Sequence, residues 1–386
     1  MYEQTPNPLP QLAFLWPAFA AASASEAAAL MARQFAELAG GGAKPAAEPD
    51  WTTPNTVALD LKTVRLRDFS TATTGTPTLL CAPFALHGAG ITDLAPGHSL
   101  VTALRKAGLR RLHVTDWRPA DETMRDLGID DYLATLNVLV DQLGAQTGGQ
   151  VDLIGLCQGG WLALLYAARF PAKVRKLVLV GAPIDIAAAP SGLSQIIAGM
   201  PTTLFADLVK LGNGRVIGRK VQKFWGPETI GAEDMHRLLE VEAPLDSDDF
   251  VALRRRFEAW YAWTLDLPGR YYLEGIDKIF QRNALVGGEF VALGERIDLA
   301  RLTTPLYLLA ARDDELVAPE QLFALARLAG TAPADIRSDL APCRHLGLFM
   351  GRKVLRDSWP AVADWLAEPE TTRIDLSQET HAPTAP

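Results

Sequence analysis

Cysteine and basic charge are both scarce in this 386-residue chain. Its three cysteines, Cys81, Cys157 and Cys343, are too few and too scattered to form a disulfide framework, which favours a reducing compartment such as the cytoplasm. The formal net charge of -8 gives no electrostatic reason to expect nucleic acid or an anionic membrane as a partner. Neither a CxxC pair nor a phosphate-binding glycine loop is present, so we expect no metal and no cofactor.

Basic residues are also missing from the apolar stretch near the N-terminus, residues 12–32. No Lys or Arg precedes Arg33, which argues against a signal peptide, and Pro17 and Glu26 interrupt any run long enough to span a bilayer. We therefore predict an Ala-rich amphipathic helix within residues 1–40. It would pack on the main domain, on a partner or on a hydrophobic surface.

The rest of the chain alternates between strand-like and helix-like segments. Short apolar runs are typical of buried parallel strands, and they occupy residues 78–84, 112–117, 151–156, 176–183 and 305–311. Helical segments separate them, at residues 98–108, 129–144, 161–170 and 319–330. Residues 57–69 alternate like a half-exposed edge hairpin. This rhythm predicts an α/β fold with a mostly parallel, doubly wound sheet, whose functional loops follow the carboxyl ends of the strands.

The same rhythm suggests where the domains divide. We expect residues 51–184 and 302–367 to form one α/β core. Residues 185–301 lose the alternation and are rich in aromatic residues and arginine, which predicts a mainly helical cap inserted between two strands. By composition, residues 41–50 are a linker and residues 368–386 a disordered tail.

Residues 155–159, Gly-Leu-Cys-Gln-Gly, place Cys157 at the apex of a turn between an apolar strand and a helix. In this context a G-x-nucleophile-x-G elbow presents its central side chain above the sheet. The helix amino terminus stabilises a thiolate there, and the backbone N–H of Gln158 can face a developing oxyanion. The alternative is a buried structural cysteine, because free cysteine is among the most buried residue types.

Acidic and basic residues follow in the order that such an elbow requires, nucleophile, then acid, then base. The loop after the last apolar run carries Asp313 and Asp314, and a later loop carries His345, one of six histidines. His345 would accept the proton of Cys157, and one of the two aspartates would orient the imidazole. We favour Asp314, because an Asp-Glu-Leu-Val sequence that ends in proline has the usual form of the acid loop. A histidine alone in a loop is more often a surface residue, so the ordered set carries this prediction.

A cysteine nucleophile has a chemical consequence. Attack of a thiolate on a thioester is nearly isoenergetic, and the acyl-enzyme that results is itself a thioester. Its group-transfer potential therefore survives for a later attack by a hydroxyl group. The site suits acyl transfer from a thioester to an alcohol, provided that a closing cap excludes water.

These motifs resemble the polyhydroxyalkanoate synthases, the family that polymerises 3-hydroxyacyl-CoA, over about residues 50–367. Residues 155–160 resemble the family's lipase-like box with its cysteine nucleophile, and Asp116-Trp117 resembles its Asp-Trp pair. Four longer segments occur in family order: ITDLAPGHSLVTALRKAGL, LGIDDYLATLNVLVDQL, LPGRYYLEGIDKIFQRNALVGGEF and RHLGLFMG. The length and the Cys-Gln-Gly-Gly box are similar to the shorter synthases, which work with a second subunit.

The resemblance implies an α/β-hydrolase fold and a triad of Cys157, Asp314 and His345. It also implies that the acyl group of 3-hydroxyacyl-CoA passes to the hydroxyl end of a growing polyester chain, with release of CoA. A second synthase subunit or a homodimer is an implied partner, and the surface of a polyester granule is another. The expected location is the cytoplasm, with granule association as a further possibility.

One loop departs from the family pattern. The shorter synthases carry Asn-Arg-Pro after the first buried strand, whereas this chain has Leu86-His87-Gly88-Ala89-Gly90. The loop is expected to supply a second oxyanion N–H near Leu86, and His-Gly-x-Gly is a sequence that esterases use there. Two alternatives to a synthase therefore stay open. One is a cap-gated hydrolase, either a polyester or oligomer depolymerase or an acyl-CoA thioesterase, with the same triad; the other is a non-catalytic granule-binding protein.

Overall fold

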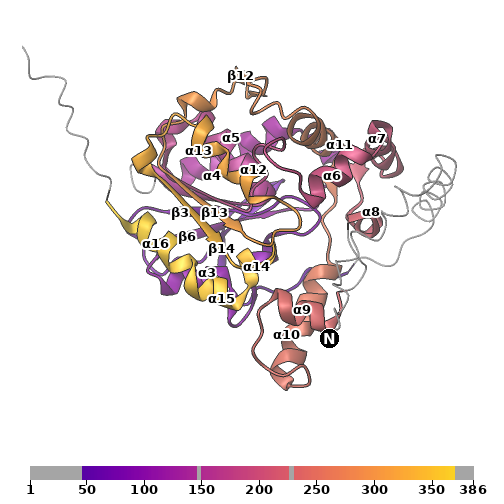
Figure 1. The fold of residues 1–386 in the computed structure, drawn as a ribbon, viewed down its shortest axis with the longest axis vertical. Coiled ribbons are helices and arrows are strands. Elements are labelled where there is room, and N and C mark those ends of the chain that lie inside the picture. The colour runs from indigo at the N-terminus through magenta and orange to yellow at the C-terminus, as the bar shows by residue number, and fades with distance from the viewer. Residues whose placement is uncertain (1–45, 146–148, 226–229, 370–386) are drawn as a thin grey trace, which may run out of the picture.

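An eight-stranded sheet forms the centre of the molecule (Figure 1) in a computed structural model that describes residues 46–145, 149–225 and 230–369. Its order is β1-β2-β6-β3-β7-β8-β13-β14. The strand bounds are β1 (Thr56–Asp60), β2 (Val64–Asp68), β3 (Thr78–Cys81), β6 (Leu112–Trp117), β7 (Val151–Leu156), β8 (Val174–Val180), β13 (Leu306–Ala311) and β14 (Ile336–Ala341). β2 is antiparallel to both β1 and β6, and all other neighbouring pairs are parallel.

The burial of the strands follows their sequence patterns. β3, β6, β7 and β13 come from continuous apolar runs, and every residue in them is buried. β1 lies at the edge of the sheet and is mostly exposed, as the alternation over residues 57–69 predicts. The prediction of a mostly parallel, doubly wound sheet with an antiparallel edge hairpin is confirmed.

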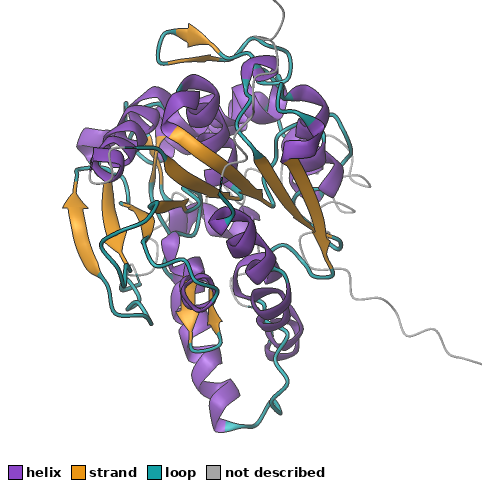
Figure 2. Ribbon diagram, turned by 90° about the vertical axis from the view of Figure 1, so that its left-hand side faces the viewer, coloured by secondary structure: helices purple, strands orange, loops and turns teal. Residues whose placement is uncertain are grey.

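Helices cover both faces of this sheet, as Figures 1 and 2 show. One face carries α4 (Ile129–Ala145), α5 (Gln158–Arg169), α12 (Pro319–Phe323) and α13 (Leu325–Leu328). The other carries α3 (Leu100–Lys106), α14 (Gly347–Met350), α15 (Arg352–Asp357) and α16 (Trp359–Ala367). The sequence predicted one helix over residues 319–330, but the structure has two short ones. The second tightens at its start, where the N–H of Arg327 donates to the carbonyl of Ala324, three residues back.

Residues 185–301, which we call the cap segment, join β8 to β13, two neighbours in the sheet. Its longer helices are α6 (Gly192–Gly199), α7 (Thr202–Leu211), α8 (Gly218–Trp225), α9 (Ala232–Leu238), α10 (Asp248–Ala262), α11 (Gly269–Gly275) and the π-helical η5 (Ile276–Gln281). Its strands are two residues long: β9 (Arg215–Val216), β10 (Leu267–Pro268), β11 (Val291–Ala292) and β12 (Glu295–Arg296). The segment is therefore mainly helical.

A small hairpin of β4 (Asp93–Ala95) and β5 (His98–Ser99) follows the short 3-10 helix η2 (Ala89–Thr92). None of the described helices combines the length and the apolar character that a bilayer-spanning segment needs. The helix predicted within residues 1–40, half of the linker at 41–50 and nearly all of the tail at 368–386 lie outside the described residues.

Candidate active site

Cys157 occupies the sharp turn between β7 and α5. Its backbone has φ 48° and ψ -118°, a left-handed conformation that is rare for a residue with a side chain. Two backbone hydrogen bonds hold the turn: the N–H of Cys157 donates to the carbonyl of Val180 at 2.8 Å, and its own carbonyl accepts from Gly160 at 2.9 Å. This strained strand-to-helix turn is the geometry of a nucleophile elbow.

The glycines around Cys157 permit close approach of the helix to the sheet. A Cβ atom on Gly159 would lie 2.2 Å from the carbonyl oxygen of Cys81 in β3. A Cβ atom on Gly155 would lie 2.6 Å from the Cα of Gly160, on the first turn of α5. Both distances are well below any real contact, so the G-x-C-x-G spacing is required by packing as well as by the turn.

His345 and Asp314 form a buried hydrogen-bonded pair. The Nδ1 of His345 lies 2.8 Å from Oδ2 of Asp314, and the two side chains are 2% and 1% exposed. The other carboxylate oxygen of Asp314 accepts from the backbone N–H groups of Leu316 and Val317, each at 2.9 Å. The carboxylate is thus fixed on both sides, and it fixes the orientation of the imidazole in turn.

Cys157 also interacts with the imidazole ring of this pair. Burial by itself lowers the pKa of His345, but the carboxylate of Asp314 and the sulfur of Cys157, which both interact with the ring by charge and by hydrogen bonding, raise it well above its ordinary value. The imidazolium is therefore stabilised between an acid and a thiol. A histidine placed between a carboxylate and a cysteine in this way can activate the sulfur as a nucleophile.

The structure distinguishes the two neighbouring aspartates. Asp314 lies against His345, whereas Asp313 is exposed and its backbone N–H donates to the carbonyl of Cys343 at 3.0 Å. The preference for Asp314 as the partner of His345 thus agrees with the geometry, and its catalytic role stays a prediction.

Glu315 and Arg344 support the same loop, although the sequence predicts no role for either. Oε2 of Glu315 accepts from the backbone N–H of His345 at 3.2 Å, and Oε1 pairs with Arg344 at 3.1 Å. Glu315 is the residue after Asp314 and Arg344 the residue before His345, so each flanks a proposed triad member. That adjacency was the only signal in the sequence, and it does not reveal the pairing.

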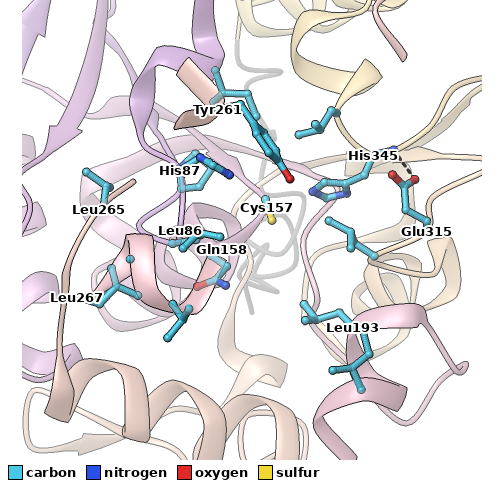
Figure 3. A pocket seen from close by; sticks show the side chains of 18 of the residues that line it. Leu86, His87, Cys157, Gln158, Leu193, Tyr261, Leu265, Leu267, Glu315 and His345 are labelled. Carbon is cyan, nitrogen blue, oxygen red and sulfur yellow. Dashed lines mark hydrogen bonds between the residues drawn. The ribbon is translucent and has the colours of Figure 1, made fainter. Parts of the chain in front are cut away.

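A cavity of about 650 Å³ opens above Cys157. Core residues Leu86, Gln158 and His345 line it together with Cys157, as Figure 3 shows. Much of the remaining lining comes from apolar side chains of the cap segment: Leu193, Ile196, Ile197, Val216, Val221, Leu265, Leu267, Ile276 and Phe280. The two residues predicted to supply oxyanion N–H groups, Gln158 and Leu86, therefore both border the space next to the sulfur.

His87 lies across the cavity from His345, with Cys157 between them in Figure 3. Its ring stacks on Tyr261 and packs against Trp260, with both centroid separations 4.8 Å. Burial lowers the pKa of His87 to about 4, against a smaller opposing effect of the backbone carbonyl of Trp263. His87 is therefore neutral near pH 7. In the sequence, His87 stands out only as part of the Leu86–Gly90 loop that departs from the family pattern.

The described residues contain no group of three or more His, Cys, Asp or Glu side chains that could hold a metal ion. Cys81 and Cys343 are both buried, and burial is the main cause that raises the pKa of each thiol, to about 12 for Cys81. Cys157 is the most accessible of the three cysteines.

Comparison with known proteins identifies the fold and the relatives of this chain. A family model for the alpha/beta hydrolase fold matches residues 86–351. The poly(3-hydroxyalkanoate) polymerase subunit PhaC of Synechocystis sp. is 32% identical over 289 residues, which cover 72% of this chain and 74% of that protein. The corresponding subunit of Allochromatium vinosum is 29% identical over 285 residues, which cover 72% and 77%.

Among solved structures, a Paleococcus ferrophilus monoacylglycerol lipase matches with a TM-score of 0.51 and 17% identity, covering 78% of this chain and 98% of the lipase. At that identity the likeness supports the fold alone. The extent of the family match and the identity to the Synechocystis protein lead to one conclusion: the chain belongs to the PhaC family of poly(3-hydroxyalkanoate) polymerase subunits, built on the α/β-hydrolase fold.

Proposed function

We propose that this protein is an acyltransferase that takes the acyl group of a 3-hydroxyacyl-CoA and passes it to the hydroxyl end of a polyester chain. The observation that carries the proposal is the buried Asp314–His345 pair directed at a strained, accessible cysteine. Membership of the PhaC family supports the choice of substrate. The mainly apolar cavity above Cys157 suits an acyl chain and a polyester better than a charged substrate.

In the first half-reaction the thiolate of Cys157 attacks the thioester carbonyl, after its proton has passed to His345. The negative charge that develops on the carbonyl oxygen is stabilised by the backbone N–H groups of Gln158 and Leu86. The carbon–sulfur bond to CoA then breaks, and the imidazolium of His345 returns its proton to the departing CoA thiolate. Cys157 is left carrying the acyl group as a thioester.

In the second half-reaction a hydroxyl group at the chain end attacks the acyl-enzyme. His345 removes the hydroxyl proton, and Asp314 stabilises the imidazolium that forms. Collapse of the intermediate makes the new ester bond and releases the sulfur of Cys157, which recovers its proton from His345. Because the acyl-enzyme is a thioester, formation of an oxygen ester from it is downhill.

The wider setting of the protein follows from the same proposal. We infer a cytoplasmic protein without a bound cofactor, whose partners are the CoA thioester and the growing polyester. A second synthase subunit or a homodimer would complete the assembly; the word subunit in the relatives' names supports an assembly for those proteins. The helix predicted within residues 1–40 would pack on the main domain, on the partner or on the granule surface.

The proposal is tested by incubating the purified protein alone with 3-hydroxybutyryl-CoA. Free thiol release is recorded while the acyl product is collected as precipitable polymer or soluble acid, with Cys157→Ala as the inactive control. Polymer that disappears in the variant is the expected result. Cys157→Ser is a second, matched variant: it keeps a nucleophile but forms an oxygen ester, so polymer yield should fall much more than the first release of CoA.

A hydrolase is the competing function, and one observation favours it. The Leu86–Gly90 loop, with its His-Gly-x-Gly sequence, is of the esterase type and borders the sulfur. Stoichiometric soluble acid without polymer would overturn the transferase proposal and assign the protein as a thioesterase. If neither 3-hydroxybutyryl-CoA nor a preformed polyester is cleaved, with a second synthase subunit added as well as without it, both functions are overturned.

A further inference from the structure

Tyr261 brings a hydroxyl group into the cavity near the reacting side chains. It belongs to α10, is only partly buried, and lines the same cavity as Cys157 and His345. Its hydroxyl oxygen points toward the space between Cys157 and His345, as Figure 3 shows. A few well-placed polar groups in a mainly apolar pocket are the groups that orient a ligand. The half-reactions described above give this hydroxyl no role.

The ring of Tyr261 is held by its neighbours. It stacks on His87 at an interplanar angle of 26° and on Phe257 at 11°. Just after α10 ends, the backbone N–H of Leu265 donates to the carbonyl of Leu86 at 2.9 Å, which ties this end of α10 to the loop beside Cys157. A hydroxyl group fixed in this way loses little conformational entropy when it binds a ligand.

Gln222 of α8 determines how the hydroxyl group of Tyr261 is used. Its side-chain amide donates to the backbone carbonyl of Tyr261 at 2.9 Å. The same side chain hydrogen-bonds the phenol and lowers its pKa, so the amide is the donor and the phenol oxygen the acceptor. The hydrogen of the phenol is not used in that bond, and it can be donated to a ligand in the cavity.

The protonation of Tyr261 also suits a hydrogen-bond donor. Burial raises its pKa to about 12, which outweighs the opposite effect of Gln222, so the phenol keeps its proton at neutral pH. A hydroxyl group that attacks the acyl-enzyme has one hydrogen, which goes to His345, and two lone pairs, one of which forms the new bond. A donor directed between Cys157 and His345 fits the lone pair that remains.

We propose that Tyr261 is a catalytic residue whose phenol O–H binds the oxygen of the chain-end hydroxyl group as it attacks the acyl group on Cys157. His345 takes the proton of that hydroxyl group, the oxygen bonds to the acyl carbon, and the carbon–sulfur bond to Cys157 then breaks. Tyr261 donates a hydrogen bond and transfers no proton. This role rests on the proposed function and deepens it by naming the group that holds the second substrate.

The two half-reactions should depend on Tyr261 to different extents. The sulfur of CoA leaves the acyl carbon from the place that the chain-end oxygen later takes. Sulfur is a weak hydrogen-bond acceptor, whereas a hydroxyl oxygen is a good one. Loss of the phenol hydroxyl should therefore slow the transfer step much more than the acylation of Cys157.

The test measures the two steps separately in Tyr261→Phe, which keeps the stacked ring and removes only the hydroxyl group. A stoichiometric amount of 3-hydroxybutyryl-CoA loads Cys157, and rapid quenching follows CoA release. The isolated acyl-enzyme is then mixed with methyl 3-hydroxybutyrate, a soluble substitute for the chain end, and mass spectrometry of the intact protein follows loss of the acyl group. We expect acylation to stay within about threefold of the wild type and transfer to slow by about 10- to 100-fold.

Tyr166→Phe is the matched control, because the hydroxyl group of Tyr166 donates to Asn137 at 3.1 Å rather than into the cavity. Both of its rates should stay within about threefold of the wild type. Equal transfer rates in the wild type and Tyr261→Phe would overturn the role of Tyr261. Acylation that slows as much as transfer would also overturn it, because the hydroxyl group would then act on the site as a whole.

The proposed function and the role of Tyr261 fail in different ways. If water removes the acyl group and methyl 3-hydroxybutyrate does not accelerate its loss, the transferase is rejected. Slower hydrolysis in Tyr261→Phe would then retain Tyr261 as the residue that binds the attacking oxygen, and equal hydrolysis would reject it. A wild type that forms no acyl-enzyme, with a second synthase subunit added as well as without it, would reject both.

Discussion

Two histidines, His345 buried and His87 partly buried, line the same cavity as Cys157, yet their environments move their pKa values in opposite directions. Burial lowers the pKa of both. His345 has the carboxylate of Asp314 at 2.8 Å and the sulfur of Cys157 beside it, and these raise its pKa well above the ordinary value. His87 has aromatic rings on two sides and a single backbone carbonyl, so desolvation dominates and its pKa falls to about 4.

The difference shows that neighbouring charged groups, rather than burial, determine which histidine of the cavity can hold a proton. A histidine that can hold a proton at neutral pH can act as a base and then as an acid, as the proposed reaction requires of His345. A histidine that stays neutral is too weak a base for that task. The side of the cavity with His345 therefore suits proton transfer, and the side with His87 does not.

Removing the charge from one side should make the two histidines alike. In Asp314→Asn the carboxylate is lost and only the sulfur of Cys157 still opposes desolvation, so the pKa of His345 should fall toward that of His87, and the ring loses its fixed tautomer. We expect kcat for CoA release to fall by about 10²- to 10⁴-fold. NMR titration of the His345 ring should register the lower pKa.

Asp313→Asn is the matched control for this change, because Asp313 is the exposed neighbour of Asp314. Its rate should stay within about twofold of the wild type. A large loss in Asp313→Asn with little loss in Asp314→Asn would reject the assignment of the acid.

The sequence predicted one side of the cavity much better than the other. The continuous apolar runs define β3, β6, β7, β8 and β13, and parallel strands bring their carboxyl-end loops together. The G-x-C-x-G elbow and the Asp and His loops could therefore be located from order along the chain. The pairing of His345 with Asp314 rather than Asp313 agrees with the preferred acid.

No motif or order along the chain predicts the side of the cavity that contains His87. Its stacking on Tyr261 depends on how the loop after β3 meets α10, two elements far apart in the chain. Neither periodicity nor a motif encodes that contact, and a neutral buried histidine has no sequence signature. For the cap segment, the sequence predicted helices correctly. It did not predict which of their side chains face Cys157.

The neutral state of His87 should also appear in the pH dependence of stability. Its pKa is 6.5 when unfolded and about 4 when folded, so below pH 6.5 the unfolded chain binds more protons than the native protein. Stability therefore falls as the pH decreases from 6.5 toward 4. Between pH 7 and about pH 4.5, the wild type should lose roughly 2–3 kcal/mol more unfolding free energy than His87→Phe.

Urea unfolding curves at the two pH values measure this difference. His98 and His113 are also buried histidines whose pKa values burial lowers, but both proteins contain them, so their contribution cancels. Equal losses in the two proteins would mean that His87 is not buried in a neutral state, and the contrast with His345 would disappear.

The smallest expected effect concerns the ion pair between Glu315 and Arg344, which supports the loop that carries His345. Glu315 accepts from the backbone N–H of His345 and pairs with Arg344, but both side chains are partly exposed, at 21% and 34%. Glu315→Gln keeps an oxygen for the backbone N–H and loses only the ion pair. An exposed pair of this kind contributes about 0–1 kcal/mol, so kcat/KM should fall by at most about fivefold.

Arg344→Gln removes the same pair from the other side, and the double variant completes a mutant cycle. If the pair acts only by steadying the loop, the two single changes should each have a small effect and the double variant should be no worse than either. A loss of 100-fold or more in Glu315→Gln, as large as that expected for Asp314→Asn, would mean that the proton-transfer side depends on a second carboxylate. The division between the two sides would then be wrong, because His345 would depend on Glu315 as strongly as on Asp314.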